Sequence, residues 1–287
     1  MKPRYITLPE NWDELTHGDW RELLKMRQEM IRLGKQVTIE DVRIETARML
    51  LKNRGVKVQL NNQNYLLLIS QLAEGLGWLW QVSDEGISLV YKSADNKLPK
   101  VREWLGPMPY AADMTFGEFR TAVAVLKNYE KQPTEEGLNM LAGLLYRPEA
   151  SRRVQRERQV IRDPYDWDGF EDKIKRGAKM QRWQVWGIYT WFAYFCEYLT
   201  TGVFTLDGEE ICFAPLFSSN EKGGMRTESS NAGDPLLQIC YTLAESHVFG
   251  TAKEVDNTLL FDVMRKLLQD YYSLQRLKNV KSKKSKP

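Results

Sequence analysis

The feature that most constrains this fold is an uncharged, aromatic stretch from Trp183 to Cys196, bounded by Arg182 and Glu197. Its 14 residues are too few to cross a bilayer, because a spanning helix needs about 20. We therefore expect a helix that is buried in the protein or in an interface, and no membrane contact.

Aromatic side chains cover most of the circumference of the helix predicted over residues 178–200. The rings belong to Trp183, Trp186, Tyr189, Trp191, Phe192, Tyr194, Phe195 and Tyr198. A stripe this wide implies contact on more than one side. Two interpretations stay open. Either a two-layer core covers all the rings, as is usual for an aromatic stripe, or Trp183, Trp186 and Trp191 form a protein-binding surface, since Trp is a favoured interface anchor.

Composition predicts a folded chain with a near-neutral body. Of its 287 residues, 43% are hydrophobic and 11% are aromatic, more than a disordered chain carries. The net charge is +3, but residues 271–287 hold six Lys and Arg and no acid, so residues 1–270 are left at −3. A nucleic-acid-binding domain carries a basic face of its own. Nucleic acid is therefore not an expected partner, and residues 278–287 are expected to form a disordered basic tail.

Cap signals and helical periodicity predict that helices make up most of the chain. Thr16 and Thr38 are expected to cap the first two helices, and Gly55 to end the second. Thr115 and Glu118 have the spacing of a capping box, in which the Glu118 carboxylate reaches back to the Thr115 N–H. The other helix limits follow from the apolar spacing. Expected helices include residues 19–34, 38–54, 65–73, 178–200 and 253–277.

Two segments change to a period of two and predict β-hairpins. One alternates on both sides of the turn at residues 83–86, and the other surrounds Asp207-Gly208, a dipeptide typical of a type I′ turn. The predicted fold class is therefore mainly α (α+β), a multi-helix protein with two small β-hairpins. The three prolines within residues 99–109 indicate an irregular crossing, and the Ser/Gly/Asn-rich residues 218–233 indicate a flexible loop.

Asp163-Pro164, after an arginine-rich segment, marks the best candidate for a domain boundary. We expect an N-terminal helical unit with one hairpin over residues 1–150 and a C-terminal helical unit with the other hairpin over residues 151–277. The arginines within residues 147–162 have two open interpretations, which are phosphate binding and ion pairs on a helix surface.

Residues for catalysis or metal binding are scarce, so we predict no enzyme, no cofactor site and no metal site. The chain has two His and three widely spaced Cys. One alternative comes from the acidic cluster at residues 163–173, in which Asp163 or Asp166 with Glu171 and Lys173 resembles the core of a Mg²⁺-dependent nuclease. The competing interpretation of this cluster is a solvated helix start.

Three stretches resemble a group of phage and prophage proteins of anaerobic gut bacteria that are encoded in tail modules. They are LPENWDELT near the N-terminus, MTFGEFRTAVAVLKNYEKQP with LNMLAGLLYRP in the middle, and LAESHVFGTAKEVDNTLLFDVMRKL near the C-terminus. The resemblance implies a tail assembly chaperone or minor tail component. Its implied partners are tail-tube or tape-measure proteins, in the host cytoplasm or the virion, and self-association is compatible with it. It carries over no catalytic residue.

Overall fold

Helices dominate the computed structural model of this chain, which describes residues 7–33, 37–56, 63–84, 86–158, 160–217 and 235–284. The mainly α fold predicted from the sequence is confirmed. The helices are α1 (His17–Leu33), α2 (Ile39–Asn53), α3 (Gln63–Glu74), α4 (Phe116–Lys131), α5 (Glu135–Leu145), α6 (Arg152–Arg158), α7 (Phe170–Ala178), α8 (Arg182–Thr201), α9 (Pro235–Glu245), α10 (Ala252–Asn257) and α11 (Leu260–Lys284).

Three small antiparallel ladders accompany these helices in the described residues. The ladders are β1 (Trp80–Ser83) with β2 (Gly86–Leu89), β3 (Lys100–Val101) with β4 (Trp104–Leu105), and β5 (Val203–Leu206) with β6 (Glu209–Cys212). The first and third are the predicted hairpins. In the third, Asp207 and Gly208 have positive φ angles of 54° and 82°, as a type I′ turn requires. The sequence does not predict β3–β4, because prolines surround it.

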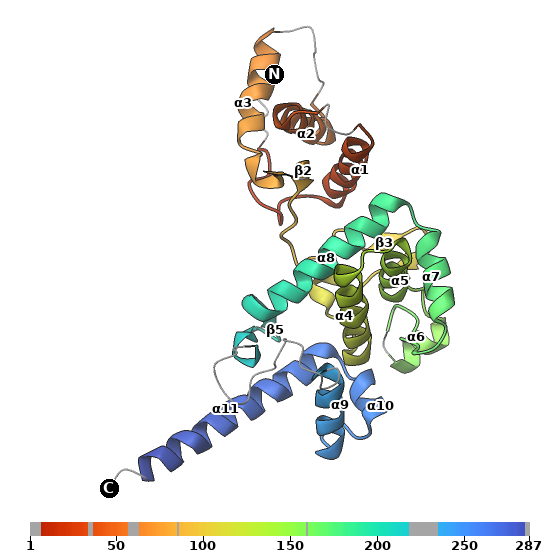
Figure 1. Cartoon of the computed structure of the whole chain (residues 1–287), viewed down its shortest axis with the longest axis vertical. Helices are drawn as coiled ribbons and strands as arrows, with labels where there is room; N and C mark the ends of the chain where they lie inside the picture. The colour runs from red at the N-terminus through yellow and green to blue at the C-terminus, as the bar shows by residue number, and fades with distance from the viewer. Residues whose placement is uncertain are drawn as a thin grey trace.

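The helices form three groups along the long axis of the molecule (Figure 1). The N-terminal group consists of α1, α2, α3 and the β1–β2 hairpin. The middle group contains α4, α5, α7 and α8, and the C-terminal group contains α9, α10 and α11. Helix α8 joins the first two groups, because it contacts α1 as well as α4 and α5. One continuous set of buried side chains reaches from Trp20 in α1 to Phe261 in α11.

Helices α5 and α7 cross with their backbones in contact, and two glycines make this possible. A Cβ atom at Gly143 would lie 1.8 Å from the carbonyl oxygen of Lys173, and one at Gly177 would lie 2.0 Å from that of Asn139. A side chain at either position would therefore force the helices apart. The boundary predicted near residue 150 falls in the chain between these two helices, and the division into two units stays a prediction.

A buried ion cluster holds the chain that follows α5 against α4. Glu118 is fully buried and accepts from Arg147 Nη2 at 2.8 Å and from Arg162 Nη1 at 3.0 Å. Arg162 also donates to Asp113 at 2.7 Å and to the carbonyl of Leu145 at 2.8 Å. Burial would lower the pKa of Arg162, but the charges of Glu118 and Asp113 outweigh burial and raise that pKa above its ordinary value.

This cluster corrects two expectations from the sequence. Thr115 does cap α4, since its Oγ1 accepts from the Glu118 N–H at 3.3 Å, but the Glu118 carboxylate points into the cluster instead of returning to Thr115. Arg147 and Arg162, expected on the surface or on phosphate, are 6% and 3% exposed. A carboxylate gains more from two charged donors in a buried site than from one backbone amide, which explains both differences.

The end of the chain also differs from expectation. The helix expected to end at Leu277 continues to Lys284, because lysine is a good helix former and cations near a helix C-terminus are stabilised by the helix dipole. The segment expected to be a disordered tail is therefore helical as far as Lys284. Residues 285–287, and the flexible loop predicted at residues 218–233, lie outside the described residues.

Candidate functional site

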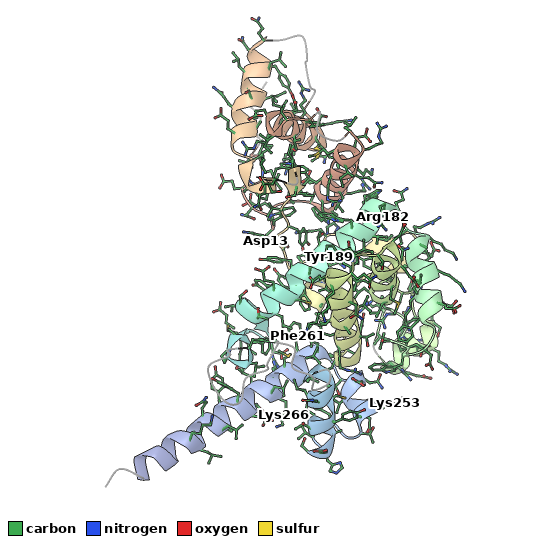
Figure 2. All side chains as sticks on the ribbon, in the orientation of Figure 1. Asp13, Arg182, Tyr189, Lys253, Phe261 and Lys266 are labelled. Atoms are coloured by element: carbon green, nitrogen blue, oxygen red, sulfur yellow. The ribbon has the colours of Figure 1, made fainter. Side chains whose placement is uncertain are left out.

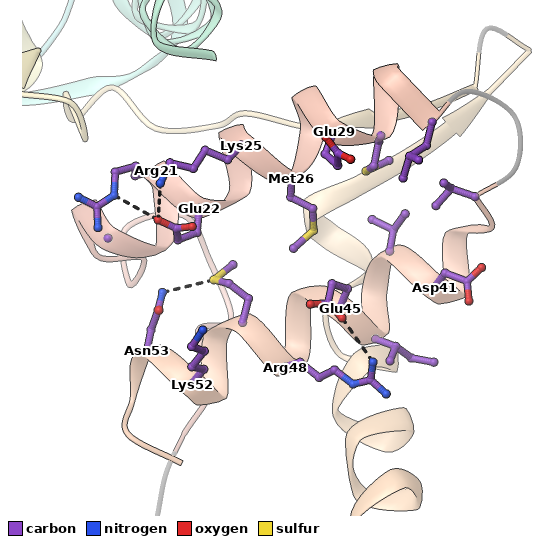
Figure 3. Close-up of a pocket in the computed structure, with 17 residues that line it drawn as sticks. Arg21, Glu22, Lys25, Met26, Glu29, Asp41, Glu45, Arg48, Lys52 and Asn53 are labelled. Carbon is purple, nitrogen blue, oxygen red and sulfur yellow. Dashed lines mark hydrogen bonds and ion pairs between the residues drawn. The ribbon is translucent and has the colours of Figure 1, made fainter. Parts of the chain in front are cut away.

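An open groove lies between α1 and α2 in the N-terminal group (Figure 3). Its volume is about 1130 Å³, and residues from Gly18 to Asn53 line it. We call it the α1–α2 groove. A concave site of this size between two helices is a common place for a ligand or for a helix of a partner protein.

Flexible apolar side chains form the floor of the groove. Met26 and Met30 from α1, and Ile44 and Met49 from α2, are half-buried and pack with one side against the core. The methionine side chain has three rotatable bonds and a polarisable sulfur, so it fits itself to surfaces of different shape. The floor therefore suits an apolar partner without demanding one particular shape.

The groove exists because the apolar stripe of α1 is wider than the core can cover. Trp20, Leu23 and Leu24 are fully buried, whereas Met26 and Met30, one helical turn apart, extend the stripe onto a neighbouring face. Helix α2 supplies the opposite wall. In the part of the chain that the structure describes, this second face of α1 is left open.

Charged side chains on the rim of the groove are separated by sign. Figure 3 shows Arg21, Lys25 and Lys52 toward one end, and Glu29 and Asp41 toward the other. Further rim charges are paired within the groove: Glu22 with Lys25 at 2.9 Å and with Arg21 at 3.3 Å, and Glu45 with Arg48 at 3.4 Å. Glu29 also pairs, with Arg32 of its own helix, so the acids at the second end are partly neutralised, while the first end has one acid beside three cations.

Two of the rim carboxylates, Glu22 and Asp41, have pKa values below their ordinary range. Burial would raise the pKa of Glu22, but the hydrogen bonds and charges of Lys25 and Arg21 outweigh it, so the pKa lies below the ordinary 4.5. Hydrogen bonds from Thr38 lower the pKa of Asp41 in the capping box at the start of α2. Both carboxylates are therefore ionised at neutral pH.

The three tryptophans proposed from the sequence as a binding surface have different positions. Trp191 is 1% exposed, its Nε1 donates to the carbonyl of Ala94 at 3.0 Å, and it cannot contribute to a surface of this structure. Trp186 is half-buried beneath the guanidinium of Arg27, which lies 3.4 Å from the ring centroid. Burial there lowers the pKa of Arg27 to about 10. Figure 2 shows how closely the side chains of α8 and α1 meet.

Trp183 is the member of this set that stands beside the α1–α2 groove. It is half-buried, and Lys25 Nζ, on the groove rim, lies 5.7 Å from its ring centroid. Most of the α8 surface is thus covered by contacts within the chain, with α1 and with the other helices of the middle group. The aromatic stripe makes contact on more than one side, and the open apolar surface nearby belongs to α1 and α2.

The acidic cluster at residues 163–173 does not bring its residues together around one point. Lys173 is buried, and its Nζ donates to the carbonyls of Asp166, at 2.6 Å, and Asp168. The exposed carboxylate of Glu171 pairs instead with Lys175 at 3.5 Å. Among the residues that the structure describes, no three His, Cys, Asp or Glu side chains form a group that could hold a metal ion.

Comparisons with protein-family models, with curated proteins and with solved structures found no match to this chain. Within the described ranges, no helix combines the length and the apolar character needed to cross a membrane. The resemblance to phage tail-module proteins noted from the sequence therefore stays a prediction.

The amino-acid sequence predicts both helices but does not reveal the α1–α2 groove between them. The available signal was the pair Met26 and Met30 on α1. These residues follow Trp20, Leu23 and Leu24, which are already enough to form the face of α1 that packs against the core. Two helices must be placed next to each other before such a pair can be recognised as an uncovered surface, and spacing along one helix does not give that placement.

Proposed function

We propose that this chain works by protein–protein contact in a phage or prophage tail module, as a tail assembly chaperone or a minor tail component. The observation that carries the proposal is the α1–α2 groove, which is open, floored by methionines and rimmed by charged side chains of both signs. The resemblance of three sequence stretches to tail-module proteins supplies the biological setting.

The proposed ligand of the groove is an amphipathic helix of a tail-tube or tape-measure protein. A helix that lays its apolar face into a groove is a common mode of recognition, and methionine-rich floors are used where the partner segment varies. A chaperone needs such a floor, because it must hold apolar surface that the partner later buries in the polymer.

Co-purification from cells that also express the tail-tube and tape-measure proteins tests the proposal. Wild-type protein should capture one of them, and Met30→Lys should lose the partner, because a charge placed on the floor must be desolvated for the helix to bind. Met108→Lys is the matched control, since Met108 is 44% exposed and is not among the residues that line the groove. Thermal melts of all three proteins should agree.

Two results would remove support for this function. If wild-type protein captures no tail component, the tail role fails. If Met30→Lys captures as much as wild type, the groove is not the binding site. The nuclease alternative has its own test, which is incubation of the pure protein with DNA and Mg²⁺. Cleavage that disappears in Glu171→Ala would favour an enzyme over the binding function.

A further inference from the structure

Helix α6 belongs to an excursion of the chain that leaves the middle group and returns to the same place. At its base, Glu149 and Arg162 face each other in an antiparallel bridge. The buried ion cluster holds both ends of the excursion, because Arg147 stands before it, Arg162 stands after it, and both donate to Glu118. Figure 1 shows α6 itself at the edge of the middle group. The excursion is therefore firmly anchored at its base, and its helix lies at the surface.

Packing of the core does not explain why α6 is there. None of its seven residues is buried. Val154 and Gln155 are half-buried, and Gln155 Nε2 donates to the carbonyl of Ala150 at 2.8 Å, so these two side chains mark the inner side of the helix. A helix this short is not stable by itself in water, and α6 has no buried apolar face to stabilise it. The sequence of its outer side calls for another explanation.

The outer side of α6 consists of arginines. At about 100° per residue, Arg152, Arg153 and Arg156 lie within one sector of roughly 100°, opposite the two half-buried residues, and all three are exposed. We call them the α6 arginine face. The chain uses lysine and arginine about equally, 21 and 20 times, yet all six cations of residues 147–162 are arginine. The planar guanidinium group can form two parallel hydrogen bonds with a phosphate, which an ammonium group cannot.

Contacts within the protein use little of this charge. In the part of the chain that the structure describes, the one ion pair of the α6 arginine face joins Arg153 to Glu157 at 3.6 Å. Both side chains of that pair are exposed, by 83% and 60%, so the pair is weak and can give way to a stronger partner. Arg158, at the end of α6, is favoured there by the helix dipole and needs no partner to explain it. The near-neutral charge of residues 1–270 is an average from which α6 departs, with four arginines and one glutamate in seven residues.

We propose that the α6 arginine face binds the phosphate backbone of double-stranded nucleic acid. A duplex carries one negative charge per about 1.7 Å of its axis, so the face, whose arginines at 152 and 156 are about 6 Å apart along the helix, meets a continuous row of charges. The carboxylates of an acidic protein form no such row. Single-stranded nucleic acid is bound through aromatic rings that stack on its bases, and residues 147–162 contain no aromatic residue. The face therefore fits the backbone of a duplex, without reading its sequence.

This surface does not include the α1–α2 groove, so the inference goes beyond the proposed function and does not depend on it. Binding to a duplex is measured with purified protein alone, and capture of a tail protein does not involve α6. Either result can fail without affecting the other.

The test is fluorescence anisotropy of a short labelled DNA duplex, titrated with the full chain over a series of salt concentrations. EDTA is present, so that cleavage does not interfere. The triple variant Arg152→Gln, Arg153→Gln and Arg156→Gln should bind roughly a hundredfold more weakly than wild type at about 0.1 M salt. The slope of log affinity against log salt should fall by about 0.9 for each phosphate contact that is lost.

A second triple variant, Lys92→Gln, Lys127→Gln and Lys131→Gln, is the matched control. It removes the same net charge at exposed positions, two of which lie at the opposite end of α4 from the ion cluster. Its affinity and salt slope should stay close to those of wild type. Both triple variants retain the six cations of residues 271–287, so any affinity that comes from the basic end of the chain is common to both.

Replacing the three arginines of the face by lysine separates loss of contact from loss of folding. This variant keeps the charge, so it should retain the salt slope of wild type, and it should bind less tightly because lysine cannot form the paired hydrogen bonds. An RNA duplex of the same length shows which of the two duplexes is preferred, and binding of either supports the proposal.

Three results would overturn the proposal. The first is equal affinity and salt slope for the arginine-to-glutamine variant and the lysine control. The second is a single strand that binds wild type as tightly as the duplex does. The third is poly-glutamate that displaces the labelled duplex as effectively as unlabelled duplex of equal charge, which would make an acidic polypeptide the partner.

Discussion

Replacing Glu118 by Gln should strongly destabilise the protein, although the two side chains have nearly the same shape. The substitution removes the carboxylate that accepts from Arg147 Nη2 at 2.8 Å and weakens the pairing of Arg162, which retains Asp113 and a carbonyl. Glu118 is fully buried, and the two guanidinium groups are 8% and 3% exposed. Solvent cannot replace the lost charge there.

The expected cost follows from this burial. Removing one partner of a buried ion pair costs about 3–5 kcal/mol, because the remaining charge stays desolvated without compensation. In chains of 150–250 residues, each kcal/mol lowers the melting temperature by about 2–4 °C, so a decrease of roughly 10 °C is expected for Glu118→Gln. Differential scanning calorimetry or a melt followed by circular dichroism measures it.

Glu171→Gln is the matched control. The Glu171 side chain is 89% exposed and pairs only with Lys175 in the ion pairs of the described chain, so its loss should change stability by less than about 1 kcal/mol. The pair of variants also separates two roles for Glu118. Glutamine serves in a capping box as well as glutamate does, so a pure capping role predicts little effect. A melting temperature for Glu118→Gln within a few degrees of wild type would refute the ion-cluster argument.

Trp191→Ala should lower the free energy of unfolding by about 3–5 kcal/mol, because the Trp191 ring is fully buried. Trp186 is half-buried, so Trp186→Ala should lower it clearly less. Equal losses in thermal melts would contradict the positions of the two rings. Gly143→Ala should force α5 away from α7 and destabilise the protein by about 1–3 kcal/mol, measured as a lower midpoint of urea unfolding. An unchanged midpoint would exclude the close crossing of the two helices. Hydrogen bonds from Thr38 hold the pKa of Asp41 below 3.8. This cap should therefore stay complete above that pH and be lost only as the pH falls through the lower folded value, which NMR of the Asp41 amide can follow.

Local sequence signals predicted the local structure well. Asp207-Gly208 required positive φ angles and produced the β5–β6 hairpin. Thr38 caps α2 as expected, within a capping box with Asp41, and Gly55, with φ of 78°, follows the end of α2. Each of these features depends on residues within four positions of one another, so the chain needs no tertiary contact to specify them.

Features that depend on distant residues could not be predicted in this way. Glu118 had the spacing of a capping residue, and its actual partners lie 29 and 44 positions away. The α1–α2 groove needed the relative placement of two helices. Trp191 and Trp183 belong to one aromatic stripe, yet only the packing of α8 against other helices shows that the first is core and the second lies beside the groove.

The crossing of α5 and α7 offers a way to recognise distant relatives when overall similarity is too low to detect. Backbone contact between these helices tolerates no side chain at either contact point, so a protein with the same crossing must have glycine at both. In this chain the two glycines are 34 positions apart, one in each helix. A search pattern made of two helical segments with paired glycines uses a geometric requirement in place of sequence identity.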